Sequence, residues 1–212
     1  MESASAQVRL RVRLRARAVR RLARVRHQQD RRRSAALAER ADLAPVADDG
    51  GALPGAELRA RKAARRALVA SWRAQGRLLD TNDLIMGAAV RAELAARGWD
   101  RPWPEPGTDA PASGRWPGSR SSGYPGAVVV LLDTALVRRV RAACWAHSAP
   151  AIAAIREWRE AHPTLTHRWL SPELWAEYDA LADRVVTPSA VYRAGLDRVL
   201  FTAHTGDPLG DL

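Results

Sequence analysis

The sequence has one cysteine, Cys144, and no long apolar segment among its 212 residues. A single cysteine excludes a disulfide within the chain, which is typical of proteins of the reducing cytoplasm. No apolar run approaches the roughly 20 residues that span a bilayer. No uninterrupted apolar segment follows the N-terminus, as it would in a secretory signal. We therefore expect a cytoplasmic protein that does not cross a membrane.

Lysine is almost absent as well, since Lys62 stands against 33 arginines. A G/C-rich genome would explain this preference, because lysine, like the equally scarce asparagine and phenylalanine, has A/T-rich codons. It would not explain where the charge lies: residues 1–40 hold 13 arginines and three acids, whereas the remaining 172 residues hold 21 basic and 20 acidic side chains. Such a block predicts a polyanionic partner, which could be DNA, RNA or an anionic membrane surface. The alternative is a solvated, disordered arm.

The stretch VRLRVRLRAR, residues 8–17, alternates apolar residues with arginines. In a strand, this period of two places all apolar side chains on one face and all arginines on the other. In a helix, the arginines would surround the axis and leave no apolar stripe. The pattern therefore predicts a strand, which must pair with another segment or with a second copy of itself.

The rest of the chain has mostly helical patterns, so we predict a mainly α fold of helical hairpins with one or two short strands. The expected parts are a basic strand-helix-helix arm (1–47), a helical hairpin (48–98), a linker rich in Pro, Gly and Trp (99–126), and a C-terminal helical domain with one strand (127–212). The aromatic residues of the linker suggest that part of it packs against the core. The alternative is a disordered interaction segment.

Several boundaries follow from local signals. The polar run Asp30 to Arg33 predicts a turn, with Ser34 capping a short second helix. Residues 127–132, AVVVLL, predict a strand, and Pro150 predicts the start of another helix. Further helix starts are expected at Thr81 or Asn82, at Asp133 or Thr134, and at Ser171. Strand-helix-helix patterns recur at 8–43, at 127–162 and, with a doubtful strand, at 165–203. The repeat is in pattern and not in residue identity, so it is weak evidence for duplication.

Residues 128–158, VVVLLDTALVRRVRAACWAHSAPAIAAIREW, and residues 170–200, LSPELWAEYDALADRVVTPSAVYRAGLDRVL, resemble the ribbon-helix-helix family of DNA-binding domains. The resemblance implies a homodimer whose paired strands form an antiparallel ribbon that enters the DNA major groove. One feature departs from the family: both alternating sets of the 127–132 strand are apolar, so we expect this strand to be buried on both faces.

The N-terminal segment fits the chemistry of such a ribbon. If residues 8–14 pair with a second copy, the arginines form a basic face suited to guanine edges and phosphates, and the arginines that follow reach the flanking backbone. The predicted nucleic-acid-binding residues are Arg9, Arg11, Arg13, Arg15, Arg17, Arg20, Arg21 and Arg24. The alternative for these residues is a flexible arm that binds polyanions without order.

Residues 77–85, RLLDTNDLI, also resemble the first strand of PIN-domain nucleases, which would make Asp80 and Asp133 ligands of Mg²⁺ together with Asp83 or Glu93. Helix N-capping explains both aspartates more simply. No phosphate-binding loop, nucleophile elbow or catalytic carboxylate pair is visible, so we expect neither an enzyme nor a cofactor. The sequence predicts a DNA-binding protein, a transcriptional regulator or a plasmid or chromosome accessory factor, binding DNA rather than RNA. The alternatives are a protein-interaction module with a non-specific nucleic-acid tether and, third, the nuclease.

Overall fold

The computed structural model describes residues 6–40, 55–107, 110, 116–117, 123–163 and 171–201. Within these ranges lie six helices and two strands, in the order β1 (Gln7–Leu14), α1 (Ala16–Ala38), α2 (Gly55–Ala74), α3 (Asn82–Ala96), β2 (Gly126–Asp133), α4 (Thr134–Ala161), α5 (Pro172–Asp183) and α6 (Pro188–Phe201). The expected mainly α fold with two short strands is confirmed. No helix in the described ranges is long and apolar enough to cross a membrane.

The two strands form an antiparallel ribbon within one chain, with Gln7 opposite Asp133 and Leu14 opposite Gly126. The alternation of β1 is confirmed: Val12 and Leu14 are buried, whereas Arg9, Arg11 and Arg13 are exposed. The pairing differs from the dimer expected from the sequence, because β2 takes the place of a second copy of β1.

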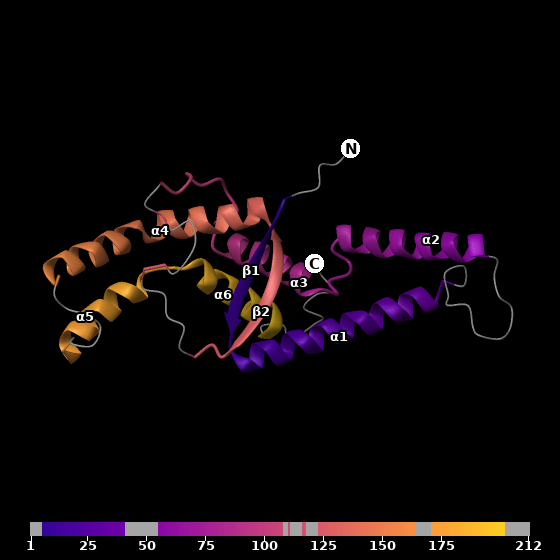
Figure 1. The fold of residues 1–212 in the computed structure, drawn as a ribbon, viewed down its shortest axis with the longest axis horizontal. Coiled ribbons are helices and arrows are strands. Elements are labelled where there is room, and N and C mark those ends of the chain that lie inside the picture. Colours follow the sequence, from indigo (N-terminus) through magenta and orange to yellow (C-terminus); the bar gives the residue numbers. More distant parts are fainter. Residues whose placement is uncertain are drawn as a thin grey trace.

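The expectation that β2 is buried on both faces is wrong. Its burial alternates, and Val129 and Leu131 are 46% and 42% exposed. Among the described residues, the helices cover one face of the ribbon, where α3 and α6 lie behind the strands (Figure 1). The outer edge of β2 is held at one point, where Asp83 of α3 accepts a hydrogen bond from the backbone N–H of Leu131 at 2.8 Å.

The described elements form two halves with the same order, one strand followed by three helices. The third helices of the two halves, α3 and α6, pack against each other, and each also packs against the strand of the other half. The first two helices of each half extend as an arm, α1 with α2 to one side of the sheet and α4 with α5 to the other (Figure 1).

Buried side chains repeat between the halves, with one constant spacing along the strands and first helices and another along the third helices. In the strands and first helices the equivalent pairs are Val12 and Val130, Leu14 and Leu132, Ala18 and Leu136, Leu22 and Val140, Val25 and Ala143, and Leu37 and Ile155. In the third helices they are Ile85 and Val191, Met86 and Tyr192, Val90 and Leu196, and Leu94 and Leu200. The repeating unit is therefore a strand with three helices present twice, not the strand-helix-helix pattern expected three times; residues 164–170, which held the doubtful third strand, lie outside the described residues.

Two expected helix breaks are absent. The helix α1 continues through the predicted turn at Asp30–Arg33 and past Ser34, because arginine is a good helix former and Asp30 and Arg33 pair one turn apart at 3.0 Å. The helix α4 continues through Pro150, which is exposed, because the residues that follow it are held in the core by Ile152 and Ile155.

Other local predictions are confirmed. Thr81, Asp133 and Ser171 each accept a hydrogen bond from a backbone N–H in the first turn of α3, α4 and α5. In the predicted linker, Trp99 and Trp116 are buried, so part of this segment does pack against the core.

Candidate nucleic-acid interface

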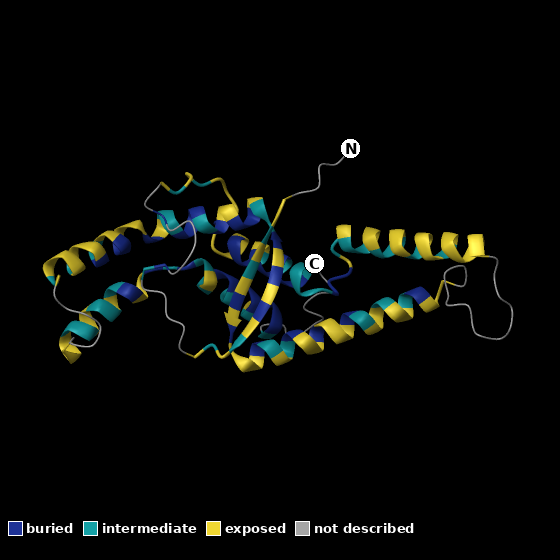
Figure 2. Cartoon of the chain, in the orientation of Figure 1, coloured by how far each residue is buried: buried dark blue, intermediate teal, exposed yellow. Residues whose placement is uncertain are grey.

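The outward face of the ribbon combines arginines with apolar side chains. Arg9, Arg11 and Arg13 are exposed along β1, at intervals of about 7 Å because alternate residues of a strand share a face. Leu131, Val129 and Ala127 of β2 lie opposite them in that order. The alternation of exposed and buried positions is visible along both strands (Figure 2).

The charges of this face are available to a partner. Within the described part of the chain, no carboxylate pairs with Arg9, Arg11 or Arg13. Guanidinium groups in general remain charged at any physiological pH. A row of three charges on an exposed strand can therefore contact an extended polyanion along its length.

Three of the predicted arginines at the start of α1 have contacts within the protein. The guanidinium carbon of Arg15 lies 6.0 Å from the centre of the Tyr124 ring, and that of Arg17 lies 5.2 Å from the centre of the Phe201 ring. Arg21 donates a hydrogen bond from Nε to the carbonyl oxygen of Leu200 at 3.2 Å. Arg17 and Arg21 thus attach α1 to the end of α6.

The remaining two predicted arginines, Arg20 and Arg24, are exposed one turn apart on α1. The repeat identifies a residue that the sequence analysis missed. Arg138 of α4 follows β2 at the same spacing as Arg20 follows β1, and it is also exposed. Because the strands are antiparallel, the two residues lie near opposite ends of the ribbon. Charge counting alone could not find Arg138, since the C-terminal part of the chain is almost neutral.

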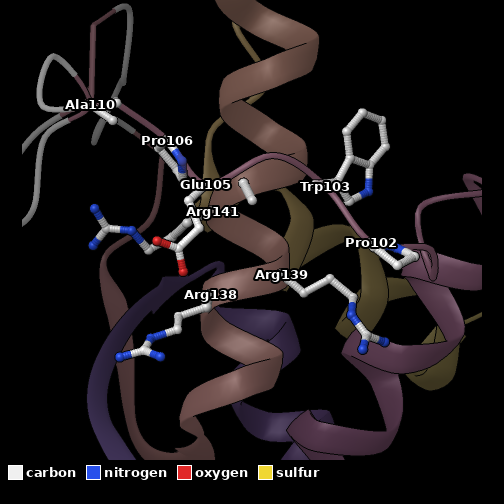
Figure 3. A pocket seen from close by; sticks show the side chains of 10 residues that line it. Pro102, Trp103, Glu105, Pro106, Ala110, Arg138, Arg139 and Arg141 are labelled. Atoms are coloured by element: carbon white, nitrogen blue, oxygen red, sulfur yellow. The ribbon is translucent and has the colours of Figure 1, made fainter.

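A cavity of about 740 Å³ adjoins Arg138, between α4 and the segment after α3. Arg139, Arg141, Trp103 and Glu105 also line it. The three guanidinium groups point in different directions and do not converge on one centre (Figure 3). The cavity therefore extends the basic surface beside the ribbon.

Asp80 is not a helix N-cap, in contrast to the expectation. It lies just before Thr81, its side chain is fully buried, and it accepts bonds from Arg73 Nε at 2.9 Å and from Arg73 Nη2 at 2.8 Å, and a further bond from Arg33. Burial alone would raise its pKa, but the two guanidinium groups outweigh burial and hold the pKa of Asp80 below its ordinary value. Asp80 therefore joins α1 and α2 to the core.

The other acidic side chains of the nuclease hypothesis are also bonded. Asp133 caps α4, and Asp83 holds the edge of β2. Glu93 is buried and accepts bonds from Arg97 at 2.6 Å and from Arg198 at 3.0 Å. In the described ranges no three His, Cys, Asp or Glu side chains form a cluster that could hold a metal ion. These contacts give the nuclease hypothesis no support.

Compared with protein-family models, with curated proteins and with solved structures, the chain matches none. The functional assignment therefore rests on the geometry of the exposed ribbon face.

Proposed function

We propose that the protein binds duplex DNA in the cytoplasm by placing the β1–β2 ribbon in the major groove. The observation that carries this proposal is the row of exposed arginines on one face of a two-stranded ribbon whose other face is buried. A two-stranded ribbon fits the width of the major groove. Regulation of transcription, or an accessory role on a plasmid or chromosome, is the use we propose for such binding.

The composition of the ribbon face supports sequence-dependent contacts. Arginine can donate two hydrogen bonds to O6 and N7 of guanine, and apolar side chains can contact the methyl group of thymine. Arg9, Arg11 and Arg13 supply the first kind of contact, and Val129 and Leu131 supply the second. We therefore expect a binding site that contains both guanine and thymine.

The flanking arginines supply contacts to the DNA backbone. Arg20 and Arg24 follow one end of the ribbon, and Arg138 follows the other. Phosphate contacts fix the position of a protein on DNA without reading its sequence. We expect these three residues to increase affinity for all sequences alike.

The ribbon is complete within one chain, in contrast to the two-chain ribbon implied by the family resemblance. One copy is therefore sufficient to form the proposed reading surface. In the homodimer expected from the sequence, each copy would carry its own ribbon, so the dimer would bind two sites.

A second candidate function is favoured by the same face. Val129 and Leu131 are large apolar side chains that remain exposed. They suit a protein partner, in which case the arginines would only tether the complex to RNA or DNA without sequence preference.

A binding experiment on the full chain separates the two candidates. Deletion of β1 is unsuitable because Val12 and Leu14 belong to the core. We expect the triple variant Arg9→Gln, Arg11→Gln, Arg13→Gln to lose at least about 100-fold in affinity for a duplex selected from random DNA, since each arginine–guanine pair contributes about 1–3 kcal/mol. The slope of log affinity against log salt should fall by about 0.9 for each phosphate that the variant no longer neutralises.

The control carries the same change of charge away from the ribbon: Arg101→Gln, Arg156→Gln, Arg184→Gln, all at exposed positions. This control should keep its preference for the selected duplex. Equal losses in the two variants, or failure of the selection to enrich any sequence, would contradict sequence-dependent reading by the ribbon. If the selection enriches no sequence and the affinity for DNA still falls steeply with salt, the result would support the non-specific tether.

A further inference from the structure

The arm formed by α1 and α2 contains an open cleft of about 380 Å³. Seven side chains line the cleft, and five of them are cationic. Arg33 and Leu37 come from α1, and Lys62, Arg65, Arg66, Val69 and Arg73 come from α2. The cleft is separate from the ribbon and from the cavity beside α4.

The cationic side chains of the cleft exceed the acidic charge that the described residues offer them. Asp80 pairs with Arg33 and Arg73 at the inner end of the arm. Within the described ranges, no carboxylate pairs with Lys62, Arg65 or Arg66. Three positive charges therefore face the cleft beyond the ion pairs of Asp80.

The arrangement of these residues does not serve the stability of α2. Arg65 and Arg66 follow Lys62 by three and four residues, and Val69 and Arg73 continue the same face of the helix. Like charges at such intervals destabilise a helix. No residue of α2 is fully buried, so packing does not offset this repulsion strongly. A bound anion would remove it.

The equivalent arm is built differently. In that arm, α4 and α5 are joined by Trp158 and Tyr178, whose ring centres lie 5.3 Å apart. Trp158 also donates a hydrogen bond to Glu177 at 3.3 Å, and Arg159 donates one to the Tyr178 hydroxyl at 3.1 Å. The side chains that join α4 and α5 here are mainly aromatic, whereas those that line the cleft between α1 and α2 are mainly cationic.

We infer that this cleft is a binding site for phosphate groups, those of a nucleoside polyphosphate or of consecutive positions in a nucleic-acid backbone. Arg65 and Arg66 can donate paired hydrogen bonds to phosphate oxygens, and Lys62 adds a point charge. Leu37 and Val69 provide an apolar wall for a sugar or base. The volume lies in the range of sites that enclose small organic ligands. The site does not depend on the proposed function of the ribbon.

Calorimetric titration of the full chain with inorganic tripolyphosphate at fixed ionic strength tests this site. The double variant Lys62→Gln, Arg66→Gln changes two exposed positions and should weaken tripolyphosphate binding at least about tenfold, as expected when two charge-assisted hydrogen bonds are removed. The matched variant Arg26→Gln, Arg59→Gln removes the same charge from exposed positions of the same two helices outside the cleft. It should change the dissociation constant by less than about twofold.

Two further probes identify the source of the phosphates. Tighter binding of ATP than of tripolyphosphate, with the same response to the variants, supports a free nucleotide. If tripolyphosphate competes with a 20-base-pair duplex for the wild type, and the Lys62→Gln, Arg66→Gln variant alone loses this competition, the phosphates are those of a nucleic-acid backbone.

The inference is overturned if tripolyphosphate does not bind the wild type at millimolar concentration, or if both double variants bind it equally. Titration of the ribbon variant Arg9→Gln, Arg11→Gln, Arg13→Gln separates this result from a failure of the proposed function. That variant should bind tripolyphosphate as the wild type does, and equal loss there would place the anion at the ribbon instead of the cleft.

Discussion

The two halves of the molecule share a fold but differ in charge. The helices α1 and α2 carry 14 Arg or Lys side chains and 2 Asp or Glu side chains, whereas α4 and α5 carry 5 and 6. Opposite Arg9, Arg11 and Arg13 of β1, the outward face of β2 holds only apolar side chains. Equivalent residues of the two halves are alike where they form the core, and they differ in charge where they face outward and could contact a partner.

The core itself shows how the two halves fit together. Ala89 and Gly195 occupy equivalent positions of α3 and α6, and they meet each other where the two helices cross. Contact between equivalent positions is characteristic of a two-fold arrangement. The single chain therefore has the internal organisation of a dimer, with the freedom to make its two surfaces different.

Among substitutions that test the difference between the two halves, removal of the Asp80 charge should have the largest effect on stability. The equivalent position, Val186, carries no charge, so this ion pair belongs to the first half alone. Asp80→Asn removes the buried carboxylate that Arg33 and Arg73 share. It should lower the free energy of unfolding by about 3 kcal/mol, the lower end for a broken buried pair because both arginines are partly exposed. Chemical denaturation at pH 7 measures this loss.

The pH dependence provides a check on the cause. Because the pKa of Asp80 is lowered in the folded state, its contribution is complete above its ordinary value of about 4 and is lost as the pH falls through the lowered value. The difference between wild type and Asp80→Asn should therefore shrink below pH 4. Asp30→Asn, which removes a partly exposed partner of Arg33, should cost less than about 1 kcal/mol. A loss independent of pH would contradict the ion-pair explanation.

The contact between α3 and α6 should show the next largest effect. A Cβ atom at Gly195 would lie 2.5 Å from the carbonyl oxygen of Ala89 and 3.1 Å from the Cβ of Glu93. Gly195→Ala should therefore force the helices apart and lower the free energy of unfolding by about 1–2 kcal/mol, because overpacking exceeds the gain in helix propensity.

Gly87→Ala is the matched control for this substitution. The added Cβ would lie 3.4 Å from the end of the flexible Arg91 side chain and 4.0 Å from Leu132. There the gain in helix propensity should dominate, with stabilisation of up to about 1 kcal/mol. Thermal and urea unfolding of both variants measures the two signs, and two changes of the same sign would contradict the crossing geometry.

The sequence predicted those features that depend on local pattern. The alternation in residues 8–14 predicted β1 and its arginine face, and Thr81, Asp133 and Ser171 predicted three helix starts. These signals are local because strand periodicity and N-capping involve only residues close in the chain.

Features that depend on distant packing were not predictable. The exposed Val129 and Leu131 could not be recognised, because an apolar run does not show which of its faces a helix will cover. The role of Asp80 could not be predicted, because its partners Arg33 and Arg73 come from two other helices. The cleft was hidden in the charge count, because acidic residues elsewhere, including those of α5, balance the basic residues of α2.

The remaining prediction concerns affinity for DNA instead of stability, and it tests a more symmetric ribbon. Leu131 of β2 is exposed and equivalent in position to Arg13 of β1. Leu131→Arg adds a fourth guanidinium group to the ribbon face and should raise affinity for non-specific duplex DNA about tenfold, or roughly 1.4 kcal/mol, while the salt slope steepens by about 0.9. Arg184→Gln combined with Leu131→Arg keeps the net charge of the wild type and should retain most of this gain, since the effect depends on the position of the charge. Fluorescence anisotropy across a salt series measures the affinity and the salt slope. Unchanged affinity would show that DNA does not lie against this face. Lower affinity for the selected duplex alone would place Leu131 against a thymine methyl group.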